Sequence, residues 1–209
     1  MDTERIMWLN QPTRHRMLEA AEQWFADVGY ELSRVDDIAS TAQVSKSHLY
    51  YHFPSKLALM SALVELRQAE LLASKDEILN SLTGQSLGGD LGELTEVLRQ
   101  LFTKTLQPRR RFIRIVLIET LKNSEEVEPI IASFNRMLQD TVDRFGKLGI
   151  PLEPARAKTL LFHFALIPAL FAVALDSSRI GLDVEIADLI GEVAIAEQNL
   201  IQMLLRRTS

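Results

Sequence analysis

Apolar residues recur at helical spacing along almost the whole chain, and this periodicity limits the fold more than any other feature. Between Met17 and Val28 they fall on one stripe of a helix, and Gly29 follows where a helix commonly ends. No segment of useful length alternates as a strand would. The sequence therefore predicts an all-α protein, with a glycine-rich loop at 83–92 and later helices around residues 94–106, 112–121, 130–148, 160–175 and 186–205.

Two short helices are expected after Gly29, close together in sequence. The first covers residues 35–42, and Ser33 is its expected N-cap. Ser45 is expected to cap the second, Pro54 to stop it, and Ser55 to cap a long fourth helix. The first 55 residues thus read as three short helices. Two short helices joined by a few residues form a helix-turn-helix, which sets its second helix into the major groove of DNA.

The second of these helices lies in a segment, residues 44–56, that holds no acidic residue. The whole protein carries 28 Asp and Glu against 23 Lys and Arg, a formal net charge of −5. A carboxylate at the start of a recognition helix would face phosphates, which explains the local absence of acids. Acids still outnumber bases over residues 1–56, so any affinity for DNA has to come from a focused face.

Residues 13–63 resemble the DNA-binding domain of the TetR family of bacterial transcriptional repressors. The resemblance rests on "RHRMLEAAEQWFADVGY" and "VDDIASTAQVSKSHLYYHFPSKLALMSAL", and it covers about a quarter of the chain. It implies a cytoplasmic, ligand-responsive repressor that binds a palindromic operator as a homodimer and is released by a small, mostly apolar effector. It also implies an N-terminal three-helix DNA-binding domain, residues 1–55, and a C-terminal helical ligand-binding and dimerisation domain, residues 56–209.

The chain departs from the family pattern at the turn and at the start of the third helix. Gln43 stands where the family most often has glycine, so we predict a non-glycine residue near positive φ, at a cost of about 1 kcal/mol. Ser47 and His48 stand where the family often has glycine and threonine. Because those side chains would read bases, the resemblance does not define the operator sequence.

DNA contacts are expected at the start of the third helix and just beyond it. Leu49 and Phe53, one turn apart, would face the core. Hydroxyl groups and Lys46 can hydrogen-bond bases or phosphates, and the helix N-terminus offers N–H groups to a phosphate. The resemblance adds Tyr50 and His52 as base or backbone contacts and Lys56 as a phosphate contact. The expected set is Ser45, Lys46, Ser47, His48, Tyr50, His52 and Lys56.

The last two helices, 160–175 and 186–205, carry more apolar surface than one chain easily covers. The resemblance implies that they pair with their copies in a homodimer; a larger intramolecular core is the alternative. It also implies a ligand cavity in the middle of the chain. Candidate lining residues are Phe102, Phe112, Ile115, Glu119, Phe134, Leu138, His163, Phe164, Ile167 and Phe171.

Ionisable groups in the apolar helices need partners. Glu119 and His163 each fall within such a helix, and the partner is either a ligand or a protein hydrogen bond. Arg109, Arg110 and Arg111 are expected to form a solvated helix start.

Composition and motifs exclude several other classes. The absence of cysteine excludes disulfide scaffolds, thiolate metal sites and cysteine nucleophiles. No export signal is expected, and the apolar run at 160–175 is shorter than the roughly 18–20 residues that span a bilayer. No catalytic or phosphate-binding motif is present, so we expect no enzyme, cofactor or metal; His48 and His52 lack a third zinc ligand nearby in sequence. A helical adaptor without DNA binding is the alternative function.

Overall fold

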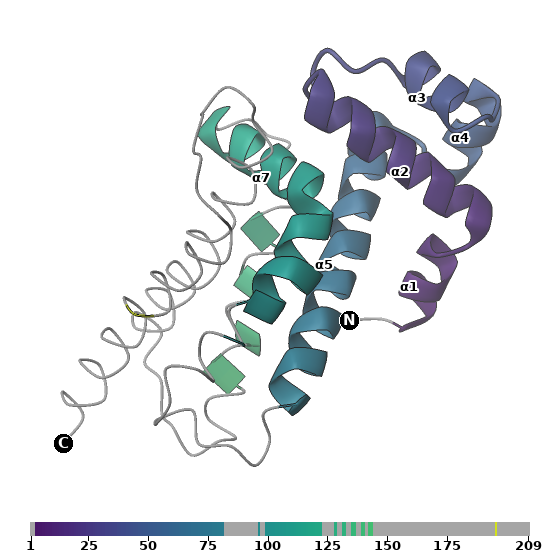
Figure 1. The fold of residues 1–209 in the computed structure, drawn as a ribbon. Helices are drawn as coiled ribbons and strands as arrows, with labels where there is room; N and C mark the ends of the chain where they lie inside the picture. The colour runs from purple at the N-terminus through teal and green to yellow at the C-terminus, as the bar shows by residue number, and fades with distance from the viewer. Residues whose placement is uncertain are drawn as a thin grey trace. The chain divides into compact units, whose positions relative to one another are not determined.

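The computed structural model describes residues 3–81, 96 and 99–122, together with residues 128, 131–132, 135–136, 139–140, 142–143 and 195. Its helices are α1 (Thr3–Leu9), α2 (Pro12–Asp27), α3 (Val35–Thr41), α4 (Lys46–His52), α5 (Lys56–Ser81) and α7 (Arg110–Lys122) (Figure 1). The π-helical segment η1 (Leu101–Leu106) and the 3-10 turn η2 (Gln107–Arg109) precede α7. No strand occurs among these residues, and the all-α class is confirmed.

Several predicted elements lie outside the described residues. These are the glycine-rich loop at 83–92 and the helices at 160–175 and 186–205, the second of which is described only at Ile195. The helix at 130–148 is described only at scattered positions, each of them helical. Within the described part, every helix is too short or too polar to cross a membrane.

The chain divides into two compact units, one made of Met1–Leu72 and Arg111–Lys158, the other of Ala73–Arg110 and Thr159–Ser209. In the first unit, α1 to α5 and α7 share one hydrophobic core. Figure 1 shows α7 crossing α5 in this unit, with α3 and α4 together at one end of α2. Fully buried side chains from all six of these helices fill the core, among them Leu9, Phe25, Ile38, Leu49, Leu63 and Ile115.

Helix α2 buries most of the predicted apolar stripe, but Trp24 is only partly buried and Val28, at the C-cap, is 40% exposed. Gly29 follows with a φ of +95°. The helix begins at Pro12, where proline lacks only an N–H that the first turn cannot use. Helix α1 was not predicted from the sequence, because its seven residues are too few to show a repeating stripe. It places the buried Leu9 in the core.

The prediction that Ser33 caps the next helix is wrong. Arg34 occupies the N-cap position of α3, with no capping hydrogen bond from its side chain. Ser33 is buried, and its hydroxyl donates to the carbonyl oxygen of Gly29 at 2.6 Å. The hydroxyl therefore closes the turn that leaves α2, a use that the sequence spacing does not distinguish from a cap.

The caps predicted for the next two helices are confirmed. The Ser45 hydroxyl accepts from the backbone N–H of His48 at 3.1 Å, and the Ser55 hydroxyl accepts from that of Ala58 at 2.9 Å. Between α3 and α4, Gln43 has a φ of +57° and is the only non-glycine residue with positive φ in the described part of the chain. The turn thus takes the left-handed conformation that the sequence predicted at Gln43.

We expect Gln43→Gly to leave the free energy of unfolding unchanged or to raise it by up to about 1 kcal/mol, because glycine has no Cβ to strain at this φ. Ala42→Gly is the matched control, since Ala42 has a φ of −73° and is buried, so that glycine there should destabilise the protein. Denaturant unfolding of both variants makes the measurement. A loss above about 1 kcal/mol in Gln43→Gly would contradict the strain argument.

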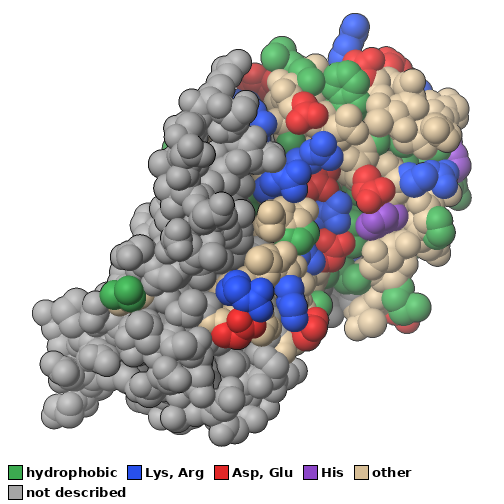
Figure 2. Space-filling model, viewed as in Figure 1, with side chains coloured by type: hydrophobic (Ala, Val, Ile, Leu, Met, Phe, Trp, Pro, Cys, Tyr) green, Lys and Arg blue, Asp and Glu red, His purple; other side chains and the backbone are tan. Residues whose placement is uncertain are grey.

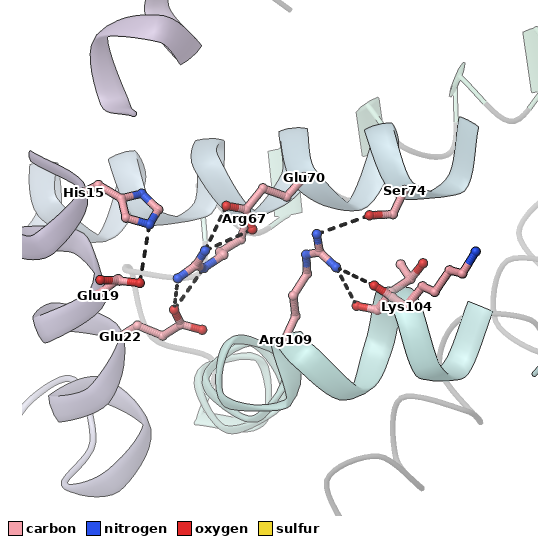
Figure 3. A network of polar contacts seen from close by, with 9 residues as sticks. His15, Glu19, Glu22, Arg67, Glu70, Ser74, Lys104 and Arg109 are labelled. Atoms are coloured by element: carbon pink, nitrogen blue, oxygen red, sulfur yellow. Dashed lines mark hydrogen bonds and ion pairs between the residues drawn. The ribbon is translucent and has the colours of Figure 1, made fainter. Parts of the chain in front are cut away.

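A buried ion cluster joins α2 to α5 in the first unit (Figure 3). The guanidinium of Arg67 donates through Nε to Glu22 at 2.9 Å and through Nη1 to Glu70 at 2.9 Å. The side chains of Arg67 and Glu22 are only 13% and 9% exposed. Two carboxylates on one guanidinium satisfy most of its donors, which is the condition for keeping these charges out of water.

Glu22→Gln is expected to lower the free energy of unfolding by about 2–3 kcal/mol, because it leaves the buried Arg67 with one carboxylate in place of two. Glu19→Gln removes a carboxylate from the same helix at an exposed pair with His15 and should cost less than about 1 kcal/mol. Thermal or denaturant unfolding compares the two. Equal losses of unfolding free energy in the two variants would contradict the claim that the buried cluster stabilises the protein more than the exposed pair does.

Within the second unit, the expectation that the arginines at 109–111 form a solvated helix start is wrong at Arg109. Its Nη1 donates to the carbonyl oxygens of Thr105 at 2.9 Å and Lys104 at 3.2 Å, and its Nη2 donates to the Ser74 hydroxyl at 3.2 Å (Figure 3). Carbonyl oxygens at the end of η1 lack regular helical partners, because Pro108 has no backbone N–H to donate. Arg109 supplies those donors, whereas Arg111 is exposed as expected.

Candidate nucleic-acid interface

Helix α4 is attached to the first unit by its two apolar residues. Leu49 and Phe53 are 1% and 2% exposed, as predicted, and both lie in the shared core. Of the predicted contact residues, Ser45, Lys46, Ser47, His48 and Tyr50 are exposed, and His52 and Lys56 are half-buried. The helix therefore turns a row of hydrogen-bonding side chains away from the core, as a recognition helix must.

Tyr51 was not chosen in the sequence analysis, yet its side chain is 82% exposed. Its ring meets that of His52 edge to face, with centroids 5.0 Å apart. Tyr50, the preceding residue, is also exposed. A large aromatic ring at this position adds a hydrogen-bonding hydroxyl to the polar face of α4.

Lys46, the first residue of α4, is paired across the turn with Asp36 of α3. The ammonium donates to Asp36 Oδ2 at 2.9 Å, and both side chains are largely exposed. The hydrogen bond and the negative charge of Asp36 raise the pKa of Lys46 above its ordinary value. Ten positions separate the two residues, and only the closeness of α3 to α4 brings them together.

Two histidines of α4 bond to each other. His48 Nε2 and His52 Nε2 lie 3.1 Å apart, so one nitrogen donates and the other accepts. The bond requires at least one neutral imidazole, because two protonated rings would point donors at each other. Burial lowers the pKa of His52, and the positive charges of Arg14 and His48 lower it further.

Helix α1 adds a cluster of aromatic and cationic side chains beside α4. The Trp8 ring packs edge-on to Phe53 at 5.9 Å and to His52 at 6.4 Å between centroids. The guanidinium carbons of Arg5 and Arg14 lie 4.6 and 4.0 Å from the centre of the same ring. The sequence analysis missed this cluster because it depends on α1 folding back onto α4.

Lys56 makes contacts within the protein that the sequence did not suggest. Its ammonium donates to the carbonyl oxygens of Tyr30 at 2.8 Å, Glu31 at 3.1 Å and Ser33 at 3.4 Å. The same ammonium lies 4.5 Å from the centre of the Tyr30 ring. In this structure Lys56 fastens the start of α5 to the turn between α2 and α3, and its contact with phosphate stays a prediction.

The predicted ligand-lining residues fall into two groups. Phe112 and Ile115 are buried in the core of the first unit, and Glu119 is 1% exposed and accepts from Lys122 Nζ at 2.8 Å. Glu119 therefore has the protein partner that was one of the two alternatives. The other candidates lie outside the residues whose side chains are described, namely Phe102, Phe134, Leu138, His163, Phe164, Ile167 and Phe171.

Charge on the described surface is mixed. Figure 2 shows Lys and Arg interspersed with Asp and Glu on the face in view, without one continuous basic patch. The described side chains also form no cluster of three or more metal-ligating groups. An arrangement of this kind suits recognition by a few placed contacts better than binding through a broad positive surface.

Comparisons with known proteins agree with this geometry. Residues 17–63 match the family model described as bacterial regulatory proteins of the tetR family. The HTH-type transcriptional activator FasR of Mycolicibacterium smegmatis is 39% identical over 70 residues, which make up 34% of this chain and 32% of FasR. The HTH-type transcriptional regulator TtgR of Pseudomonas putida is 31% identical over 108 residues, 51% of this chain and 50% of TtgR.

The alignments with these curated relatives therefore span about a third to a half of their length. Among solved structures, a TetR-like transcriptional regulator from Rhodococcus sp. RHA1 superposes with a TM-score of 0.57 at 21% identity, over 87% of this chain and 93% of that chain. At this identity the likeness shows the fold alone.

The histidine pair predicts a pH dependence of stability. Because the folded protein lowers the pKa of His52 below the ordinary 6.5, the stability that its neutral form contributes is present above pH 6.5 and is lost as the pH falls through the folded pKa. We expect denaturant midpoints to decline over this range and His52→Gln to flatten the decline. His15→Gln is the control, since it removes a histidine outside the pair. An unchanged pH profile in His52→Gln would contradict the assignment.

Proposed function

We propose that this chain is a ligand-responsive, non-catalytic repressor of the TetR family of bacterial regulatory proteins, whose family model residues 17–63 match. We propose further that it binds a palindromic operator as a homodimer. The observation that carries the proposal is the presentation of α4. Leu49 within α4 and Phe53 at its C-cap are buried, and Ser45 caps its N-terminus. All its polar side chains except the half-buried His52 are exposed.

In the proposed complex α4 enters the major groove. Lys46 and Tyr50 lie one helical turn apart, so they can reach neighbouring bases or phosphates along one groove. His48 and His52 hold each other's rings through their Nε2 atoms, which fixes the direction of the two remaining ring nitrogens. Ser45, Ser47 and Lys56 complete the proposed contact set, within a DNA-binding domain of residues 1–55.

We assign residues 56–209 to effector binding and dimerisation. A single short recognition helix reads only a half-site, so a dimer through the helices at 160–175 and 186–205 would supply the second. The effector is proposed to be small and mostly apolar, because the candidate lining is rich in phenylalanine. FasR is named an activator, so the direction of the effector's action has to be measured.

Helix α7 offers a physical route from effector to DNA. Phe112 and Ile115 of α7 lie in the same hydrophobic core as Leu49 of α4. At its other end, a Cβ built on Gly29 would come within 4.0 Å of Lys122 Nζ, so α7 ends beside the turn that follows α2. Because packed cores rearrange between discrete states, a displacement of α7 would have to move the helices that it packs against.

DNA binding is tested with a duplex selected from a random-sequence library by the wild-type protein. Lys46→Ala, His48→Ala and Tyr50→Ala should each weaken binding by about 1–3 kcal/mol, measured by fluorescence anisotropy at fixed salt. The wild-type affinity should fall steeply with salt, and the bound species should contain two chains per site. Lys104→Ala removes the same charge from an exposed position elsewhere and should change little. The absence of salt-dependent DNA binding would favour the adaptor function, and wild-type affinity in all three variants would contradict the proposed contact residues.

Effector control is tested by a thermal-shift screen of lipophilic compounds against the whole chain. Compounds that bind the folded protein should raise its melting temperature, and those that act as effectors should lower operator affinity about 5–150-fold. Structurally related compounds that do not shift the melting temperature serve as controls. Ligands that stabilise the protein while operator affinity stays constant would show a binding site that is not coupled to DNA.

A further inference from the structure

The ion pair between Lys46 and Asp36 places a carboxylate at the edge of the proposed DNA-binding face. Lys46 begins the helix that the proposed function sets into the major groove, and Asp36 lies in the first turn of α3. The ammonium and Asp36 Oδ2 are 2.9 Å apart, with the two side chains 51% and 62% exposed. A DNA group that approaches Lys46 therefore meets an ammonium that is already paired with a carboxylate.

Stability alone does not account for this pair. Exposed pairs of this kind contribute little to folding, since water and salt screen them. The two helices are held instead by their buried residues, Ile38 and Ala39 in α3 and Leu49 in α4. Asp36 also interacts favourably with the N-terminal end of α3, but Asp37 occupies the same first turn. What Asp36 adds is its direct contact with Lys46.

We propose that Asp36 is a specificity-determining residue, which holds Lys46 away from DNA backbone phosphates and keeps its ammonium placed for a matched base. The inference rests on the proposed DNA-binding function. Binding to unselected DNA comes almost wholly from phosphate contacts. A lysine neutralised by a carboxylate contributes little to that binding, and the carboxylate itself repels nearby phosphates.

A matched operator can bind Lys46 without breaking this pair. The ammonium has three N–H donors, so with α4 seated in the groove it can donate to guanine O6 or N7 while it still donates to Asp36. A backbone phosphate instead meets a neutralised ammonium and a carboxylate that repels it. Asp36 therefore weakens binding to unselected DNA more than binding to the operator, and it widens the ratio between the two affinities without touching a base.

The other charged and titratable groups around Lys46 fit this assignment. Tyr50, one turn along α4, raises the pKa of Lys46, and Arg34 before α3 lowers it, but both act more weakly than Asp36. Neutralising Asp36 consequently removes the main negative charge that acts on the Lys46 ammonium. Asn at this position keeps a side-chain oxygen that can still accept from Lys46, so geometry is preserved while the charge is lost.

The test compares Asp36→Asn with Asp37→Asn in the full chain, on the selected duplex and on an unselected duplex of equal length. Both changes remove one negative charge from the first turn of α3, and only the first alters the pair with Lys46. Asp36→Asn should tighten binding to unselected DNA about three- to tenfold and steepen its salt dependence by about one phosphate contact, with a smaller change on the selected duplex. Circular dichroism verifies that each variant keeps its helices.

A second background separates direct from general electrostatic effects. In Lys46→Met, where the ammonium is absent, Asp36→Asn should change binding no more than Asp37→Asn does. The proposal is overturned if the two asparagine variants behave alike on unselected DNA. It is also overturned if Asp36→Asn tightens both duplexes equally, because Asp36 would then tune affinity rather than specificity. A wild-type protein that binds neither duplex would reject the proposed function itself, and the inference with it.

Discussion

Every exposed feature of α4 depends on the hydrophobic core that α4 shares with α1, α2, α3, α5 and α7. Leu49 and Phe53 fix the rotation of a helix only seven residues long, which could not persist alone in water. The polar side chains point outward because these two point inward. The buried Arg67 cluster then holds α2 to α5 beside that core, so the two helices cannot slide without separating charges that are largely shielded from water.

The features that the sequence predicted correctly depend on interactions between residues that are close together in the chain. The end of α2 at Gly29, the strained turn at Gln43 and the caps at Ser45 and Ser55 all follow from local backbone chemistry, and each is confirmed. The role of Ser33 was predicted wrongly, because a serine hydroxyl at this position can either accept from a backbone N–H of the following helix or donate to the preceding Gly29 carbonyl. The sequence does not distinguish the two hydrogen bonds. Lys56, Asp36 and Arg109 take partners that only tertiary packing brings near. The proposed contact set for DNA stays a prediction, since the structure fixes its placement and not its use.

The electrostatics of the first unit show how an acidic protein can offer a face to a polyanion. Acids are absent from the segment that carries α4, but they return beside it through folding, at Asp36. The cations next to α4 are also engaged, since Arg5 and Arg14 stack on Trp8 and Lys56 binds backbone carbonyls. Local pairing of this kind keeps the net field weak at long range while leaving donors available at short range, which favours discrimination over attraction.

The position of Trp8 has a practical consequence. Indole emission responds to the polarity and charge of its surroundings, and this ring touches a titratable imidazole and two guanidinium groups at the edge of α4. The second tryptophan, Trp24, is held by a hydrogen bond from its Nε1 to Thr41, 2.9 Å away on α3. The protein thus contains an intrinsic fluorophore beside the proposed DNA-binding surface, and its fluorescence can follow occupancy of that surface without any attached dye.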